Sequence, residues 1–544
     1  MLKSIRVRSY SLIASLVLAT CMDSINMQVT SVDLPEMAGR LHATPDERAW
    51  INIAYLASRS IGLMVAPTLS EILGRKRILA CAIITVTIAS VLCTLQDEIG
   101  WLCFWRAVQG LGGAPLFVTG LQVLFLKLPL QRQGITQAFF ALANMLGTTV
   151  FPFFLGWISD RSSWHWVFLQ NVPIGALSLY LLRASLRRDT PTRSLAKFDQ
   201  KGVVLLGLAA FTLQFALTQG TRYNWGDEPL ITACLIVGGL ATLAFALWQR
   251  SLRNRNRLFD FRVLLVPEYV YGLSISLLAG YATSGSGFLF PNFVRSVFQY
   301  NSADTGLALL PSGIAAVIGL FIGGYGVQSK RFSPSIVLWT GISFLLSSML
   351  LLSVITYQVA LGDLMIPLVL RGGGLGLLAA PSLIVAFSRL NSRHVAHGAG
   401  LFNLARQLGG SLATASLSWR LAYGTEYYRN IMASRMSFGS PVAISRIAET
   451  IHNLTSHGIR LGQAAKTAIA VSNLAFKGQI DVLSYNDCFQ EVALVYGVGV
   501  TSMIALRKYM NYHSDLRRST LSGRLESRLA SRELATGASE SGKI

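Results

Sequence analysis

The chain has 544 residues, of which 52% are hydrophobic and only 13% are charged, and its mean hydropathy is +0.49. Soluble proteins carry about a quarter charged residues, so this composition excludes an ordinary soluble protein and predicts a multi-pass protein in a lipid bilayer. The net charge of +21 would also suit nucleic acid, but basic residues collect in the cytoplasmic loops of membrane proteins, and we expect no nucleic-acid partner.

Apolar runs that are long enough to cross a hydrocarbon core of roughly 30 Å as helices recur along the chain. The first run follows Lys3, Arg6 and Arg8 and looks like a secretory leader that ends at Cys21. Because the apolar stretch continues past Cys21, an uncleaved first span is the preferred interpretation, and a cleaved leader stays open as the alternative. The fourteen predicted spans are residues 10–33, 49–69, 78–96, 101–126, 134–158, 165–184, 201–219, 229–249, 267–294, 304–326, 335–357, 361–388, 396–419 and 487–507.

Basic residues gather in alternate loops and in the C-terminal tail. The dense groups are residues 75–77, 183–201, 250–262 and 507–543. Because Lys and Arg collect on the cytoplasmic side of membrane proteins, this bias places both termini in the cytoplasm, and an even number of spans agrees with it. We expect the membrane to be a bacterial inner (plasma) membrane.

Two long regions lie outside the predicted spans. Residues 420–486 are predicted to form a long external loop, with weakly amphipathic stretches around 441–453 and 462–476. Residues 508–544 are predicted to form a basic cytoplasmic tail without fixed structure, because a polar, Ser-rich segment cannot bury a core.

The chain also repeats itself. RAVQGLGGAP at 106–115 is echoed by RGGGLGLLAAP at 371–381, and LANMLG at 142–147 is echoed by LARQLG at 404–409, at nearly the same separation. Two similar halves with a site between them near the bilayer midplane are typical of transporters. The expected domains are an N-terminal six-helix bundle at 1–195, two additional membrane helices at 196–255, a C-terminal six-helix bundle at 256–507 and the tail at 508–544.

Arg106 stands inside an apolar span, in the stretch FWRAVQGLGGAP. A charge at this depth costs some 2.5–3.5 kcal/mol on insertion scales, so the side chain should face the protein interior or water and have a partner. Two interpretations stay open: a role in proton coupling, and a structural role in which the guanidinium bonds carbonyl groups of neighbouring helices.

Several motifs together resemble the fourteen-helix drug:proton antiporter branch of the major facilitator superfamily, from about residue 22 to residue 507. The fourth-span motif RxxQGxGxA is intact at Arg106, Gln109, Gly110, Gly112 and Ala114. The segments WHWVFLQNVPIG, LFNLARQLGGSLATA, FDQKGVVLL and SYNDCF match other helices of that family. The resemblance implies a membrane transporter of the major facilitator fold, built from two pseudo-symmetric six-helix bundles plus two extra central helices.

Two motifs of that family are altered in this chain. The resemblance implies that the loop PTLSEILGRKR latches the halves in one conformation. Gly74 and the basic run from Arg75 remain and Glu71 takes the carboxylate position, but Pro67 and Ile72 replace a glycine and an arginine, so we expect a weakened latch. A plain basic loop that only sets the topology is the alternative. The fifth-span antiporter motif reads GTTVFPFFLG, in which Gly147, Pro152 and Gly156 survive. Proline bends a helix and glycine permits close helix contact, so the bend should remain while the contact surface is partly lost.

The first span carries the candidate proton site. The resemblance implies an acid at the position that Asn26 holds, but Asp23 lies one turn away, and Asp33 stands nearer the external rim. At 100° per residue, Asp23, Asn26, Thr30 and Asp33 fall within about 80° on one helix face. We expect Asp23, with Arg106, to exchange the proton, and Asp33 is the rival.

Further residues are expected to line the central cavity. Arg59 can pair with Asp23 or with Asp33, and the residues alone do not choose between them. The other candidates are Gln109, Thr30, Tyr55, Gln214, Asn403 and Arg406. The aromatic residues expected to stack cationic or planar drugs are Trp50, Tyr55, Phe139, Phe140, Phe153 and Phe154.

The resemblance implies secondary active export of small amphipathic compounds, driven by inward proton flow, with a periplasmic adaptor protein and an outer-membrane channel as possible partners. A narrow-range exporter of a siderophore or a metabolite, a polytopic membrane enzyme and a sensor without transport are the alternatives. No HExxH, nucleophile-elbow or GxxxxGK[ST] pattern occurs in the chain, so we expect neither catalysis nor an ATP-driven pump. The six cysteines form no CxxC pair, and we expect no metal and no cofactor.

Overall fold

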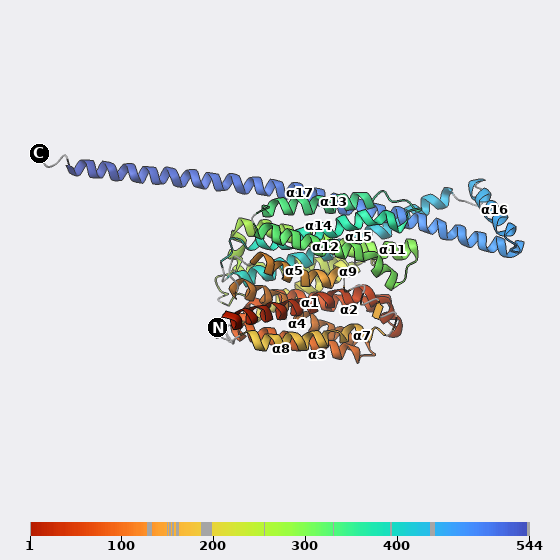
Figure 1. Ribbon diagram of the computed structural model, residues 1–544, viewed down its shortest axis with the longest axis horizontal. Coiled ribbons are helices and arrows are strands. Elements are labelled where there is room, and N and C mark those ends of the chain that lie inside the picture. The colour runs from red at the N-terminus through yellow and green to blue at the C-terminus, as the bar shows by residue number, and fades with distance from the viewer. Residues whose placement is uncertain are drawn as a thin grey trace. The chain divides into compact units, whose positions relative to one another are not determined.

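The computed structural model describes residues 2–127, 133–149, 151, 154, 157–158, 161, 163–186, 198–254, 256–329, 331–391, 394–435 and 441–540. Every regular element within these residues is a helix, so the predicted all-α fold class is confirmed. Figure 1 shows the helices of the two halves lying side by side in one bundle. By compactness the chain separates into two units, residues 1–495 and 496–544, and the bundle belongs to the first.

The helices fall into an N-terminal group, a C-terminal group and a pair between them. The N-terminal half contains α1 (Leu2–Arg40), α2 (Pro45–Leu73), α3 (Arg75–Thr94), α4 (Ile99–Lys127), α5 (Gln133–Thr149), α7 (His165–Leu169) and α8 (Asn171–Ser185). The pair consists of α9 (Gln200–Gln219) and α10 (Pro229–Arg250). The C-terminal half contains η3 (Phe261–Leu265), α11 (Pro267–Phe298), α12 (Ser302–Gln328), α13 (Pro334–Leu352), η4 (Leu361–Leu364), α14 (Met365–Phe387), α15 (Val395–Arg435), α16 (Pro441–Ser456) and α17 (Leu461–Glu540).

Each of the fourteen predicted spans overlaps a helix of the described chain. Twelve described segments are long and apolar enough to cross a membrane. The other two predicted spans lie on α5, whose apolar segment Ala138–Gly147 is shorter, and on α15. Residues 150–158 of the fifth span lie largely outside the described residues, and so do Pro152 and Gly156.

The connection between α2 and α3 shows how local chemistry sets the helix boundaries. Gly74 ends α2 and begins α3 with φ 84°, a conformation that favours glycine because a side chain would clash with the backbone. Directly after it, the Lys76 ammonium donates to the carbonyl oxygens of Arg183 and Leu186, which ties α3 to the C-terminal end of α8. The end of the bundle that contains this connection is called the Gly74 end below.

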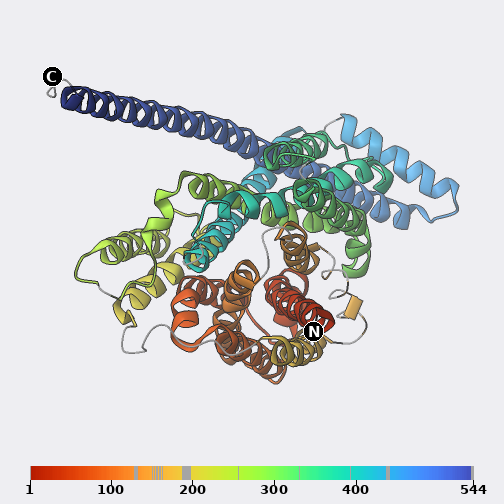
Figure 2. The ribbon, with the colours of Figure 1, turned by 60° about the vertical axis from the view of Figure 1, so that its left-hand side comes forward.

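The two halves repeat the same packing. In the N-terminal half α2 packs on α4 and α1 on α5, and in the C-terminal half α12 packs on α14 and α11 on α15. Between the halves, α5 packs on α12 and α15 packs on α2, which is again a symmetric pair of contacts. Figure 2 shows the red-to-orange helices of one half facing the green-to-cyan helices of the other. The sequence echo therefore corresponds to a structural repeat.

A hydrophobic cluster joins the halves at the Gly74 end. Leu63 of α2 and Leu124 of α4 belong to the same buried cluster as Phe387 of α14 and Phe402 of α15. A side chain at Gly400 would come within 2.3 Å of the Leu63 carbonyl oxygen, so α15 and α2 lie in backbone contact there. The halves are thus packed tightly together at this end of the bundle.

The extra helix α9 contacts both halves. It packs on α10, on α2 and on α15. On the N-terminal side, the Trp50 ring lies 5.1 Å from the Phe215 ring. On the C-terminal side, the Ser411 hydroxyl donates to the Gln214 side-chain oxygen over 3.0 Å. Gln214, a predicted cavity residue, therefore bonds α15 from the outer helix pair.

Two expectations about the C-terminal region are wrong in secondary structure. The predicted loop at 420–486 is mostly helical, because α15 continues to Arg435, α16 covers Pro441–Ser456 and α17 begins at Leu461. The tail, predicted to lack structure, continues α17 to Glu540 and makes up most of the second unit, residues 496–544. Its Leu, Arg, Glu and Ala residues favour helix, and a helix satisfies its own backbone groups without a core.

Candidate functional site

A buried ion pair connects the first two helices. Asp23 of α1 is fully buried, and Arg59 of α2 is 1% exposed. The Arg59 guanidinium donates from Nε to Asp23 Oδ1 over 3.0 Å and from Nη2 to Oδ2 over 2.7 Å, and the Tyr55 hydroxyl donates to Oδ1 over 3.2 Å. The structure therefore places Arg59 on Asp23. A fork-shaped pair of this kind fixes both side chains.

The third nitrogen of Arg59 reaches the other half. Its Nη1 donates to Gln407 Oε1 of α15 over 2.8 Å. Gln407 in turn donates to the Leu56 carbonyl oxygen over 2.7 Å and to the Ser60 hydroxyl over 2.8 Å, both on α2. The sequence interpretation missed Gln407, although it lies four residues after Asn403 on the same helix face. The Asp23–Arg59 pair is thus continuous with a polar contact between the halves.

Arg106 of α4 lies deeply buried beside the same site. Its Nη1 and Nη2 both donate to the Asn26 carbonyl oxygen over 3.2 Å, and Nη1 also donates to Gln109 Oε1 over 3.0 Å. The guanidinium carbon lies 4.3 Å from the centre of the Tyr55 ring. Arg106 therefore bonds a backbone carbonyl, as the structural interpretation expected, and it lies over the Tyr55 ring, whose hydroxyl donates to Asp23.

Polar side chains from two further helices, α3 and α8, complete this region. Gln109 donates to the Ser90 hydroxyl of α3 over 2.8 Å, and Asn171 of α8 donates to the same hydroxyl over 3.0 Å. Asn171 also donates to the side-chain oxygen of Asn26 over 2.8 Å. Neither Ser90 nor Asn171 was predicted, and the available signal was a polar residue in each otherwise apolar span. The Asn26 side chain is therefore held by α8.

The glycines of the fourth-span motif permit the close approach of neighbouring helices. A Cβ atom at Gly110 would lie 2.3 Å from the Tyr55 carbonyl oxygen of α2, and one at Gly112 would lie 3.1 Å from Val86 of α3. Gly113, which no prediction singled out, faces Asp23: a Cβ there would lie 2.5 Å from Oδ1. Gly147 of the altered fifth-span motif lies against α1 in the same way.

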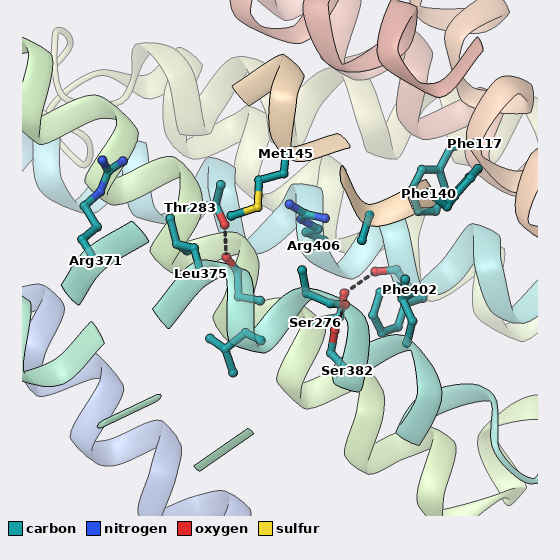
Figure 3. Close-up of a pocket in the computed structure, with 15 residues that line it drawn as sticks. Phe117, Phe140, Met145, Ser276, Thr283, Arg371, Leu375, Ser382, Phe402 and Arg406 are labelled. Atoms are coloured by element: carbon teal, nitrogen blue, oxygen red, sulfur yellow. Dashed lines mark hydrogen bonds between the residues drawn. The ribbon is translucent and has the colours of Figure 1, made fainter. Parts of the chain in front are cut away.

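A cavity lies between the halves. Its walls come from α4 and α5 on one side and from α11, α14 and α15 on the other, and in this conformation its volume is about 50 Å³ when the space open to solvent at its mouth is left out. Figure 3 shows Arg406 near the middle of the labelled residues, Arg371 at one end and the Phe117, Phe140 and Phe402 rings at the other. The lining residues are Phe117, Phe140, Ala141, Met145, Ser276, Ala279, Thr283, Arg371, Leu375, Leu378, Ala379, Ser382, Leu383, Phe402 and Arg406.

The predicted cavity residues divide between this cavity and other places. Arg406 and the Phe140 ring line the cavity. Phe139 and Phe154 are exposed on the surface. Asn403 is buried, and its Nδ2 has no hydrogen-bond partner within the described part of the chain. The side chains of Thr30 and Asp33, together with Phe153, lie outside the described residues.

A second acid lies within a predicted span. Glu491 of α17 accepts a hydrogen bond of 3.3 Å from the Tyr281 hydroxyl of α11, and that hydroxyl also lies 3.0 Å from Ser416 Oγ. The sequence interpretation overlooked Glu491, although its position inside the last span was a sufficient signal. It belongs to the C-terminal half and makes no described contact with the Asp23 pair.

Comparisons with known proteins agree with this architecture. The sequence model of the Major Facilitator Superfamily matches residues 16–414. The chain is 26% identical over 406 residues to the probable multidrug resistance protein EmrY of Escherichia coli, covering 74% of this chain and 78% of that protein. It is 23% identical over 500 residues to the colistin resistance protein EmrB of Acinetobacter baumannii, covering 90% of this chain and 94% of that protein.

Solved structures show the same fold at lower sequence similarity. The proton:xylose symporter XylE, bound to 6-bromo-6-deoxy-D-glucose, superposes with a TM-score of 0.55 at 13% identity, covering 89% of this chain and 94% of that chain. An inward-facing bacterial homologue of the lysosomal transporter Spinster superposes with a TM-score of 0.51 at 15% identity, covering 92% and 98%. These likenesses concern the fold.

Proposed function

The chain belongs to the Major Facilitator Superfamily, and from that premise we propose that it exports small amphipathic compounds in exchange for protons, with the Asp23 carboxylate as the proton-exchanging group. The observation that carries the proposal is the chain of contacts from Asp23 through Arg59 to Gln407. It joins an ionisable group to a contact between the halves, which is what coupling a proton to a change of access requires. The multidrug export named for several relatives supports the substrate class.

Protonation of Asp23 would change the energy of this contact. The ionised carboxylate balances the buried Arg59 charge, and removing one partner of a buried ion pair costs about 3–5 kcal/mol. When Asp23 takes up a proton, Arg59 loses its ionic partner, and its bond to Gln407 no longer has a fixed geometry. The halves can then separate along α2 and α15. The groups that face Asp23 are Tyr55 and Arg59 of α2, with Arg106 of α4 behind the Tyr55 ring.

We place the Gly74 end in the cytoplasm, together with both termini, in a bacterial inner membrane. The basic residues Arg75, Lys76 and Arg77 at this end support that orientation. The hydrophobic cluster between the halves also lies there. In this orientation the described conformation is the one closed toward the cytoplasm.

The test of the proposal distinguishes two roles of Asp23: carrying the transported proton, and only balancing the buried charge of Arg59. Asp23→Asn alone leaves Arg59 buried without an ionic partner, so it should lower both stability and transport. The double variant D23N/R59Q removes both charges and should restore the melting temperature. If Asp23 carries the proton, the double variant in proteoliposomes should still exchange substrate for substrate but should not accumulate it against a pH gradient.

Gradient-driven accumulation by D23N/R59Q at the wild-type rate would contradict the proposal. Glu491→Gln is the matched control, because Glu491 is also an acid within a predicted span and lies in the C-terminal half, apart from the pair. It should leave proton coupling intact. If Asp23→Asn transports normally and Asp33→Asn does not, then the proton site is Asp33.

A further proposal concerns the helical segment at 420–486, which we infer contributes to docking a periplasmic adaptor that leads to an outer-membrane channel. Its support is its exposure: Tyr423, Tyr427 and Ile444 are exposed large side chains on α15 and α16. Replacing residues 436–460 with a short Gly-Ser linker should abolish co-purification with a coexpressed adaptor while transport into proteoliposomes continues. Unchanged co-purification would count against docking at this segment.

A further inference from the structure

The cavity between the halves carries two cationic side chains. Arg406 of α15 and Arg371 of α14 both line it. None of the lining residues within the described chain is acidic. In a site of low dielectric, two cations without a carboxylate are costly to hold, so the cavity favours a ligand that brings negative charge.

The hydrogen bonds of the lining residues point the same way. Within the described chain Arg371 makes one hydrogen bond, from Nη1 to the Ser312 hydroxyl over 3.2 Å, and its Nε has no partner there, although the residue is only 4% exposed. No hydrogen bond or ion pair connects the Arg406 guanidinium to another described residue. Both guanidinium groups therefore keep unused donors.

The hydroxyl groups of the lining offer no competing donor. The hydroxyls of Ser276, Thr283 and Ser382 each donate to a backbone carbonyl oxygen, those of Phe402, Ala279 and Ala379. The free N–H donors of the described lining thus belong to the arginines. A ligand that satisfies them must supply strong acceptors, and carboxylate and sulfonate groups do so with the geometry that guanidinium groups prefer.

The other end of the cavity is apolar and aromatic. Phe117 lies 5.1 Å from Phe140 between ring centres, and both rings line the cavity together with Phe402. In Figure 3 this aromatic end lies opposite Arg371, with Arg406 between them. A ligand that fits both ends has an aromatic or aliphatic body and an anionic group at one end.

We propose that this cavity selects amphipathic organic anions, with Arg406 and Arg371 binding a carboxylate or sulfonate and the Phe117, Phe140 and Phe402 rings packing on the apolar body. The inference rests on the proposed export function and names its substrate class. It differs from the expectation that the cavity aromatics stack cationic or planar drugs, because a cation would face two guanidinium groups without a carboxylate partner in the described lining. Arg406 directly precedes Gln407, so an anion that moves Arg406 acts on the helix that bonds Arg59.

The test uses three probes with one aromatic body and different charges: 1-pyrenebutyrate, its methyl ester and (4-pyren-1-ylbutyl)trimethylammonium. Binding is measured by energy transfer from tryptophan to pyrene, with the purified protein in phosphatidylcholine nanodiscs and empty nanodiscs as the blank. Wild type should bind the butyrate about 10-fold or more tightly than the ammonium compound, the size expected for hydrogen bonds to a charged group. Equal or tighter binding of the ammonium compound overturns the proposal, as does failure of all three probes to bind.

Arginine variants assign the preference to this cavity. Arg406→Gln should weaken butyrate binding by about 10-fold while ester binding, which also reports correct folding, stays the same; Arg371→Gln should act in the same direction. Arg429→Gln is the control, because Arg429 lies on the exposed part of the same helix and pairs with Glu426. An unchanged charge preference in both cavity variants overturns the assignment.

Two further arms separate the possible outcomes. Repeating the binding in nanodiscs that contain phosphatidylglycerol distinguishes a free anion from a lipid headgroup: unchanged butyrate affinity supports the proposal, and competitive loss assigns the arginines to lipid and overturns it. Transport of the probes into proteoliposomes under a pH gradient is measured separately. Transport without anion preference refutes only the substrate class, whereas anion binding without gradient-driven transport refutes only the export function.

Discussion

Arg106 of α4 and Arg371 of α14 begin the two echoed stretches of the chain, yet their surroundings differ. Arg106 makes three hydrogen bonds, to the Asn26 carbonyl oxygen and to Gln109, and lies over the Tyr55 ring. Arg371 makes one, to the Ser312 hydroxyl, and lines the cavity. The repeated pattern therefore supplies a cation with three hydrogen bonds in one half and with one in the other, while the Nε of each arginine has no partner within the described residues.

The difference suggests a division of labour between the halves. In the N-terminal half, polar side chains from α1, α3, α4 and α8 surround Arg106, so that its geometry is fixed. In the C-terminal half, Arg371 and Arg406 have fewer partners within the described residues, and we propose that a ligand supplies the missing acceptors. A fixed charge suits proton coupling, because small changes at Asp23 are then felt by groups that cannot relax. An unsatisfied charge suits binding, because the ligand supplies the missing acceptors.

The strongest test of this comparison exchanges each arginine for lysine. Lysine keeps the positive charge but cannot make the forked contacts of a guanidinium. Arg106→Lys should lower the initial rate of transport by about 100-fold, since two or more charge-assisted bonds are lost, each worth roughly 1.5–3 kcal/mol. Arg371→Lys should retain the maximal rate and mainly raise the KM for an anionic substrate, because a point charge still attracts a carboxylate.

Initial rates in proteoliposomes, measured over a range of substrate concentrations, decide this prediction, and the amount of protein in the membrane fraction controls for insertion. Full transport by Arg106→Lys would mean that the N-terminal half needs only a positive charge there. Equal losses in both variants would mean that the two arginines do the same work and that the division of labour is wrong.

A smaller effect is expected from glycines of the two stretches. Gly113→Ala would place a Cβ 2.5 Å from Asp23 Oδ1, and Asp23 is fixed by Arg59 and Tyr55. Overpacking of this kind typically costs about 1–3 kcal/mol, so we expect a lower melting temperature and roughly a 10-fold loss of gradient-driven transport. Gly373→Ala meets Phe344 at an ordinary 3.5 Å and should be silent.

The melting temperature and the gradient-driven transport rate of both alanine variants test this prediction. Gly373→Ala is a matched control, because both variants add one methyl group to a glycine of an echoed stretch. Gly113 lies in the stretch that begins with Arg106, and Gly373 lies in the one that begins with Arg371. If Gly113→Ala transports normally, the position of the Asp23 carboxylate is not critical for coupling. If Gly373→Ala is equally harmful, the loss reflects helix packing in general.

The sequence predicted the architecture because that information is local. Apolar length marks each span, and the two arginine-led stretches mark the repeat. It also placed Asp23, Arg59 and Arg106 inside spans. It could not choose between Asp23 and Asp33 as the partner of Arg59, because that depends on how α1 is rotated against α2. Rotation is a property of tertiary packing and has no signature in the spacing of one helix.

Other parts of the site were missed for related reasons. Ser90 and Asn171 were visible as polar residues in the spans, but their contacts with Gln109 and Asn26 follow from the packing of four helices, α1, α3, α4 and α8. The sequence interpretation selected the charged residue Arg406 and gave its neighbour Gln407 no role. In the structure Gln407 bonds α2, whereas Arg406 lines the cavity. The helical extension at 420–486 was missed because the spans were recognised by hydropathy, and a polar helix outside the bilayer leaves no apolar run.

The helix pair α9–α10, which belongs to neither half, holds a carboxylate whose role we expect to be structural, in contrast to that of Asp23. The Oδ1 atom of Asp199 accepts from the Gly202 amide over 2.9 Å and from Trp248 Nε1 over 3.0 Å. Its Oδ2 atom accepts from Gln249 Nε2 over 2.7 Å and from Asn254 Nδ2 over 2.8 Å. The carboxylate thus fastens the start of α9 to the end of α10.

Asp199→Asn should therefore affect stability slightly and transport hardly at all. Burial raises the pKa of Asp199, but the hydrogen bonds from Trp248, Gly202, Asn254 and Gln249 together lower it by more. The pKa of Asp199 therefore lies below its ordinary value. A group with a lowered pKa stabilises the fold above its unfolded pKa of about 3.9 and loses that contribution as the pH falls through its folded pKa. The variant should melt roughly 2 °C lower than wild type at pH 7, and the difference should shrink below about pH 4.

Melting curves of purified protein between pH 3 and pH 8 measure this difference. Asp227 is exposed, so Asp227→Asn is the control that should match wild type throughout. A melting difference that is unchanged at pH 3 would show that the four hydrogen bonds do not depend on the charge, and a loss of proton coupling would make Asp199 a second coupling site beside Asp23.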